Sequence, residues 1–128
     1  MASRTFDEAV HIAAMWWVNK VIKPTFNNGM NDKQGLFAQS LASYMTEDIN
    51  KSQAMKFYDS LVEVINEDIE KNGRCTLESD YAPDGSLYEA YNRSETPTAN
   101  APWKCWMVIS ETGEIKFKDG YGSPIESL

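Results

Sequence analysis

Residues 52–81, SQAMKFYDSLVEVINEDIEKNGRCTLESDY, contain the change of periodicity that decides the fold. From about Ser52 to Asn72 the apolar side chains recur every three to four residues, which predicts the buried stripe of a helix, and Gly73 is well placed as its left-handed stop. After Gly73 the periodicity becomes two, which is typical of a half-buried strand. The apolar stripe of the helix comprises Tyr58, Leu61, Val62, Ile65 and Ile69. In the strand, one set of alternating positions is Cys75, Leu77, Ser79 and Tyr81, and the other is Thr76, Glu78 and Asp80.

Two helical patterns precede this stretch. The first begins at Thr5-Phe6-Asp7-Glu8, which has the form of a capping box, and is stopped by Pro24. The second begins near Asn31 or Asp32, after the turn-forming residues 27–29. In this second helix we expect an inward-facing set that comprises Leu36, Phe37, Leu41 and Tyr44.

The residues after position 81 add a β-hairpin. Lys104–Ser110 is apolar on both faces, which predicts a central strand, and a turn at 111–114 joins it to a second strand at Ile115–Lys118. Ser86–Tyr91 has the length of one or two helical turns, and the tail from Gly120 is expected to be irregular. These patterns predict one α+β domain over residues 1–128. In it, two or three N-terminal helices pack on a small, mainly antiparallel three-stranded sheet formed by the C-terminal half.

Composition limits the classes of function. The 128 residues have a net charge of −7 and a pI near 4.6, which is unfavourable for binding nucleic acid through its phosphates. No stretch has the pattern of a membrane span or an export signal, so we expect a cytoplasmic location in the host cell. Cys75 and Cys105 match no metal-binding spacing and are expected to be reduced thiols in the core.

Acidic side chains are concentrated in the middle of the chain. Residues 47–95 hold twelve acidic and five basic residues, which accounts for the whole net charge. Four of the acids recur at helical spacing on one face of the third predicted helix, about 6 Å apart along its axis, which approaches the spacing of phosphates in a nucleic-acid strand. An uncompensated row of this kind suits a basic partner surface, although a solvated helix face explains it as well. The row is Asp59, Glu63, Glu67 and Glu70, and the nearby acids that extend it are Glu78, Asp80 and Asp84.

Residues that would carry catalysis are few. His11 lies within a helical pattern, where a packed or rim position is the usual role, and the chain contains no nucleophile elbow, no phosphate-binding glycine loop and no HExxH motif. Asp80 and Asp84-Gly85 resemble part of a calcium loop, but a turn explains them without an ion. We therefore expect no enzyme activity, no cofactor and no metal site. Aromatic residues gather near the hairpin, either as core or as an exposed anchor: Trp103, Trp106, Phe117 and Tyr121.

Three short segments carry a resemblance to known proteins. Residues 101–104 (APWK), 120–124 (GYGSP) and 80–85 (DYAPDG) resemble segments of small uncharacterised proteins of phages and mobile elements of gut bacteria. The size, the acidity and the lack of catalytic residues are also similar to those of anti-CRISPR proteins, a resemblance of profile from which no residue is carried over. Anti-CRISPR proteins are phage-encoded inhibitors that bind CRISPR nucleases, often on a positively charged DNA-binding surface.

The leading hypothesis is therefore a non-enzymatic inhibitor that binds a basic host protein, with a type II CRISPR effector nuclease as the first candidate. Its acidic row would stand in for DNA phosphates, and an aromatic side chain would supply apolar anchoring. One alternative is a structural or assembly protein of a phage or mobile element that acts as an oligomer. Another is an enzyme or small-molecule binding domain built around an aromatic pocket.

Overall fold

The fold consists of helices and one antiparallel sheet. The computed structural model describes residues 4–128. The helices are α1 (Phe6–Ile22), α2 (Lys33–Tyr44), α3 (Lys51–Asn72) and α4 (Gly85–Arg93), followed by the short 3-10 helix η1 (Thr98–Asn100). The strands are β1 (Arg74–Ser79), β2 (Pro83–Asp84), β3 (Cys105–Ser110), β4 (Ile115–Asp119) and β5 (Glu126–Ser127). The α+β prediction is confirmed.

The sheet is larger than the sequence predicted. Its order is β2-β1-β3-β4-β5, with every neighbouring pair antiparallel and β3 at the centre. The prediction of three strands was wrong because the two edge strands hold only two residues each, too few to produce a period of two. The helical layer also differs, since α4 comes from the middle of the chain and not from the N-terminal part.

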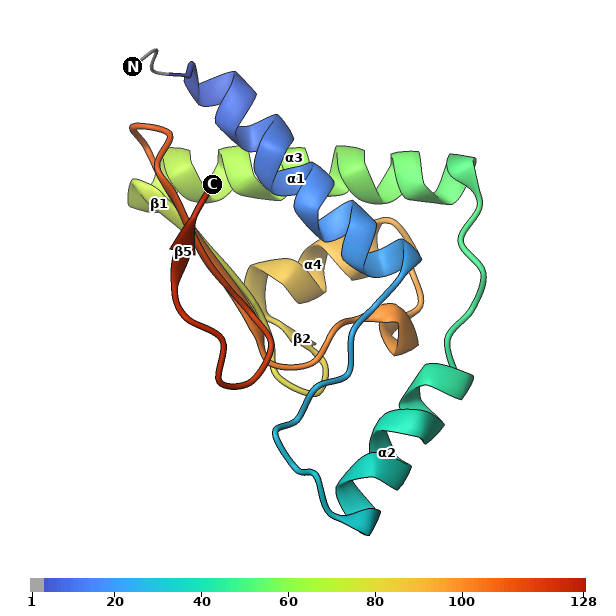
Figure 1. Cartoon of the computed structure of the whole chain (residues 1–128). Helices are drawn as coiled ribbons and strands as arrows, with labels where there is room; N and C mark the ends of the chain where they lie inside the picture. Colours follow the sequence, from blue (N-terminus) through green and yellow to red (C-terminus); the bar gives the residue numbers. More distant parts are fainter. Residues whose placement is uncertain (1–3) are drawn as a thin grey trace.

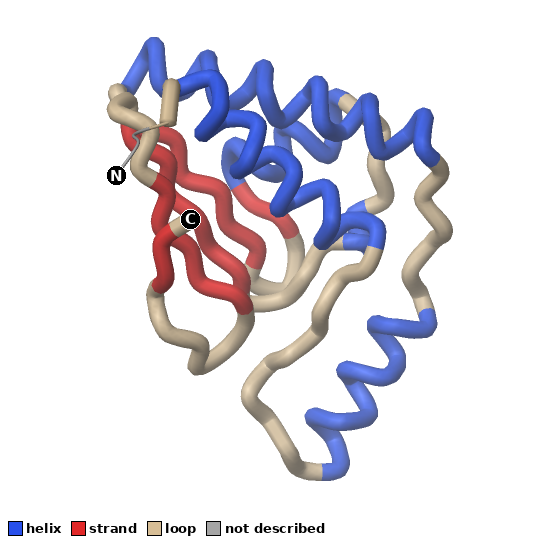
Figure 2. Tube along the Cα trace, turned by 45° about the horizontal axis from the view of Figure 1, so that its top comes forward, coloured by secondary structure: helices blue, strands red, loops and turns tan. Residues whose placement is uncertain are grey.

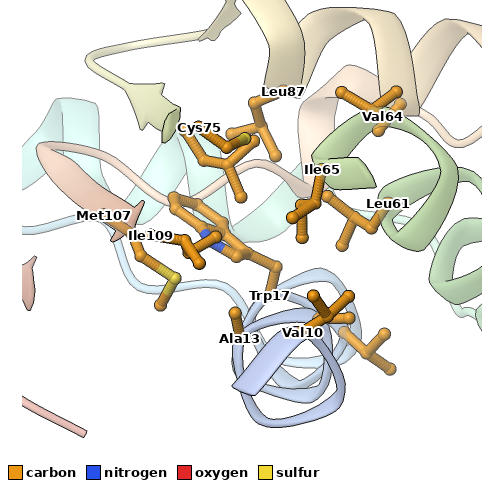
Figure 3. Packing of buried hydrophobic residues seen from close by; sticks show 14 of the residues in the cluster. Val10, Ala13, Trp17, Leu61, Val64, Ile65, Cys75, Leu87, Met107 and Ile109 are labelled. Atoms are coloured by element: carbon orange, nitrogen blue, oxygen red, sulfur yellow. The ribbon is translucent and has the colours of Figure 1, made fainter. Parts of the chain in front are cut away.

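Helices α1, α3 and α4 cover one face of the sheet (Figure 1; Figure 2). The inward side chains of the strands alternate along the chain, so Cys75 and Leu77 of β1 and Met107 and Ile109 of β3 are buried under the helices. Trp17 of α1 lies among them (Figure 3). The opposite face of the sheet has no helix over it (Figure 2), which leaves its side chains at least partly exposed.

Local sequence explains where the helices begin and end. Thr5 and Glu8 form the expected capping box at the start of α1, and Asn50 accepts a hydrogen bond from the backbone of Gln53 at the start of α3. Gly73 ends α3 with a φ of 76°, a left-handed conformation that side chains with a Cβ rarely adopt. This stop turns the chain directly into β1 and thereby fixes the junction of the two layers.

Helix α2 projects away from the body of the protein (Figure 1). Its start at the Asp32 N-cap agrees with the prediction, but the expected inward-facing set was wrong, since Leu36, Phe37, Leu41 and Tyr44 are all exposed and Tyr44 is 88% exposed. The pattern identified a helix correctly. It gave no information on what covers the apolar side, and in this chain the body does not cover it.

A buried amide fixes both ends of this projecting segment. We call residues 23–46, which carry α2, the arm. The side-chain nitrogen of Asn100 donates to the carbonyl oxygens of Val21 and Glu47, at 2.9 and 2.8 Å, and its oxygen accepts from the backbone nitrogen of Glu47 at 2.9 Å. The two ends of the arm therefore meet at one hydrogen-bonded neck, and the arm also contacts the body at Thr25, whose carbonyl oxygen accepts from the backbone nitrogen of Trp103 at 2.8 Å. Within residues 4–128, no helix combines the length and the apolar composition needed to cross a membrane.

Candidate partner-binding surface

The acidic row of α3 lies beside α4, and one arginine joins the two helices. Arg93, in the last turn of α4, donates from Nη1 to Oε1 of Glu63 and to Oε2 of Glu67, both at 2.8 Å. Its Nη2 reaches Oε1 of Glu67 at 2.9 Å, and its Nε reaches Oε1 of Glu89 at 2.9 Å. The interpretation of the row as uncompensated was therefore wrong. Helical spacing could not reveal this pairing, because Arg93 lies 26 residues or more from its α3 partners.

The guanidinium organises the carboxylates that it partly neutralises. Its hydrogen bonds lower the pKa of Glu67 below the usual range and raise that of Arg93 itself, so each group favours the charged form of the other. Glu63, Glu67 and Glu89 share this one positive charge. Within residues 4–128, Asp59 and Glu70 form no ion pair, and both are exposed. We call these five carboxylates and Arg93 the acidic face.

The other three predicted acids lie elsewhere. Asp84 is at the N-terminal end of α4, where it accepts from the backbone nitrogen of Gly85 at 2.9 Å, whereas Arg93 ends the same helix. Nine helical residues separate the two ends by about 13 Å. Glu78 is paired with Asp84 across β1 and β2, and Asp80 is ion-paired with Lys104 at 2.5 Å. The seven predicted residues therefore form two groups and not one continuous stripe.

The second group borders a hollow on the uncovered face of the sheet. The hollow has a volume of about 430 Å³. Glu78, Trp106 and Lys118 are cross-strand neighbours there, so an acid, an aromatic ring and a base lie side by side on β1, β3 and β4. The mixed charges do not resemble a row of phosphates. The residues of the hollow therefore differ in chemistry from the acidic face, whose carboxylates remain the candidate for contact with a basic partner.

Two of the four aromatic residues near the hairpin, Trp103 and Phe117, pack against aromatic rings of other segments. Trp103 packs edge-on against Phe26 and Tyr81, with ring centroids 5.4 and 5.0 Å apart. Phe117 is buried and packs on Trp16. These contacts give Trp103 and Phe117 a packing role.

His11, Cys75 and Cys105 lie in three different elements, α1, β1 and β3. His11 is exposed, and its Nδ1 lies 2.7 Å from the hydroxyl of Tyr58. Cys75 and Cys105 are free and buried, and burial raises the pKa of both thiols, that of Cys105 to about 12. Neutral thiols are poor nucleophiles. Within the part of the chain that the structure describes, no cluster of three or more His, Cys, Asp or Glu side chains could hold a metal ion.

An apolar groove that the sequence did not predict lies between α1 and α3. Its volume is about 540 Å³, and its walls are formed mainly by Met15, Val18, Ile22, Ile49, Met55 and Tyr58. Each helix has a second apolar flank beside the one that faces the core. The sequence of α1 contains more apolar residues than one buried stripe needs, which indicates a second apolar side. It did not indicate which element would lie beside that second side.

Comparisons with known proteins give no indication of the function, so the surfaces described above are the basis for a proposal. No protein-family model and no curated protein matches the sequence. On the part of the chain that the structure describes, three surfaces have a chemistry that the fold itself does not explain: the acidic face, the apolar groove and the exposed apolar side of α2.

Proposed function

We propose that this protein is an inhibitor of phage or mobile-element origin that acts by binding and not by catalysis. Its target is a CRISPR effector nuclease, a type II enzyme in the first instance. The acidic face occupies the positively charged surface on which the nuclease binds DNA. The observation that carries the proposal is the set of five exposed or half-exposed carboxylates on two adjacent helices, three of which Arg93 holds in fixed positions.

Arg93 leaves these carboxylates able to bind a partner. An ionised carboxylate has about four acceptor positions. Arg93 uses one oxygen each of Glu63 and Glu89 and one hydrogen bond to each oxygen of Glu67. Lysine and arginine side chains of a partner can occupy the remaining positions. Because the side chains are already ordered, binding costs less conformational entropy than it would for free glutamates.

The two ends of the row provide the cleanest test of this proposal. Asp59→Lys and Glu70→Lys alter the acidic face without breaking an ion pair within residues 4–128, so the fold should be retained. The control Glu114→Lys/Glu126→Lys, with one change in the exposed β3–β4 turn and one in β5, makes the same double charge reversal on a different part of the surface. We expect the double variant Asp59→Lys/Glu70→Lys to lose inhibition of DNA cleavage at least tenfold and the control to keep it. Equal inhibition by all three proteins would exclude the acidic face as the binding surface.

A second candidate function is favoured by the arm. An assembly protein needs apolar surface that remains open to neighbouring copies, and α2 exposes such a surface. Assembly predicts oligomers that grow with concentration beyond a dimer. An inhibitor needs no such growth, so the size distribution in solution separates the two functions.

A further inference from the structure

The arm presents an apolar ridge. Leu36, Phe37, Leu41 and Tyr44 lie within about 140° of arc around α2. All four are exposed, as is Met45 at the end of the helix. A monomeric protein rarely exposes apolar side chains contiguously in this way. The ridge therefore indicates a surface that a partner covers.

The groove between α1 and α3 is the complementary shape on the same chain. Along α1 it extends from His11 to Ile22, about 16 Å, and the twelve residues of α2 are about 18 Å long. Its floor is almost entirely apolar, and its two methionines, Met15 and Met55, can adapt to an inserted side chain. A helix of the length of α2 fits such a groove in the manner of other helix-in-groove complexes.

The position of the groove relates it to the arm. Ile22 and Ile49 line the groove, and these residues flank the arm on either side of the neck. Ridge and groove are therefore adjacent but separate on one chain. A second copy, related by a two-fold axis near the neck, covers both at once because each chain supplies one ridge and receives one.

The area and the charge agree with a second copy as the occupant. If a large side chain presents roughly 150–250 Å², the exposed fractions of the ridge and of Met15, Ile22 and Met55 amount to roughly 800 Å² per chain. A stable interface requires about 800 Å² per partner. Within residues 4–128, the side chains that line the groove include Lys51 and no carboxylate, and Lys33 is the one charged residue of α2, so this contact lacks the acid–acid repulsion that the acidic face would bring to a self-contact.

We infer that the protein forms a closed two-fold dimer in which the apolar ridge of each arm occupies the α1–α3 groove of the other copy. The dimer is independent of the proposed function because neither surface includes the acidic face. It leaves both acidic faces available, so a dimer presents two of them.

The test uses three variants that each place a glutamate at an exposed apolar position of a helix. Phe37→Glu changes the ridge, Met55→Glu changes the groove, and Tyr88→Glu on α4 is the control; the three side chains are 67%, 57% and 50% exposed. Light scattering after size exclusion, with the full chain over a range of concentrations, gives the mass. We expect a dimer of about twice 14.5 kDa for the unchanged protein and the control. We expect dissociation constants raised roughly 1,000-fold for the other two, since each change affects both contacts of the dimer.

Mixing the two weakened variants distinguishes arm-in-groove exchange from other contacts. A heterodimer of Phe37→Glu and Met55→Glu retains one intact ridge and one intact groove that meet, so it should form more tightly than either variant alone. A monomeric unchanged protein would overturn the proposal. A dimer that persists in the Met55→Glu variant would also overturn it, because such a dimer would be held together by contact between the two arms. Oligomers larger than a dimer would also overturn it and would support the assembly function.

Discussion

The buried side chain of Asn100 should be one of the most sensitive polar positions in this protein. Replacing it by alanine removes three hydrogen bonds of 2.8–2.9 Å and leaves two carbonyl oxygens and one N–H near the neck without their protein partner. A hydrogen bond contributes about 0.5–1.5 kcal/mol net, and an unpaired buried group costs about 1–3 kcal/mol. The bonds to Glu47 are only partly buried, so water replaces some of the loss there. We expect Asn100→Ala to lower the free energy of unfolding by about 3 kcal/mol.

Urea denaturation, followed by tryptophan fluorescence and by circular dichroism, measures this change. Asn66→Ala is a matched control on the exposed surface of α3, where alanine's better helix propensity should raise stability by a few tenths of a kcal/mol. All proteins must be compared at one concentration, because a dimer makes apparent stability depend on it. A loss below about 1 kcal/mol for Asn100→Ala, with an unchanged urea dependence, would refute the assignment of Asn100 as the clamp of the neck.

Three other predictions follow from the contacts described. At pH 8, the rate at which Cys75 and Cys105 react with a thiol reagent should be limited by the rate of the unfolding that exposes them. Rapid labelling of both thiols in the native protein would contradict their burial and raised pKa values. The folded protein lowers the pKa of Glu67, so the ionised Glu67 stabilises the fold at pH values above its usual pKa of 4.5, and this stability is lost as the pH falls through the lowered pKa. Glu67→Gln should therefore be less stable than the unchanged protein at pH 7 and equally stable near pH 2. The urea midpoints at the two pH values measure this difference. A constant difference at both pH values would exclude the ion pair with Arg93 as its cause. Leu61→Ala, in the middle of the core, should cost about 2–5 kcal/mol by the same measurement, and a cost below 1 kcal/mol would be inconsistent with full burial.

Sequence patterns were informative wherever local chemistry decides the structure. The capping box at Thr5, the stop at Gly73 and the alternation in β1 each depend on neighbouring residues, and each is present in the structure. The two short edge strands were missed because their pairing depends on the strands already in the sheet. Their positions follow from tertiary structure and not from their own sequence.

The candidate surfaces could be identified only from the folded structure, because they combine residues that are far apart in the sequence. The row from Asp59 to Glu70 was found by helical spacing, but its compensation by Arg93 was not, because α3 and α4 meet only in the folded chain. The same applies to Asn100, whose partners are 53 and 79 residues away. The periodicity of α2 was read correctly as a helix, whereas its exposure depends on the neck that carries it outward.

The most direct measurement of the proposed function is titration of this protein against guide-loaded type II CRISPR nucleases in a DNA-cleavage assay at two salt concentrations. We predict inhibition near stoichiometry that weakens as salt rises and that the Asp59→Lys/Glu70→Lys variant loses. Full cleavage in the presence of excess folded protein would contradict the proposal for those nucleases and would leave the acidic face as a solvated helix surface.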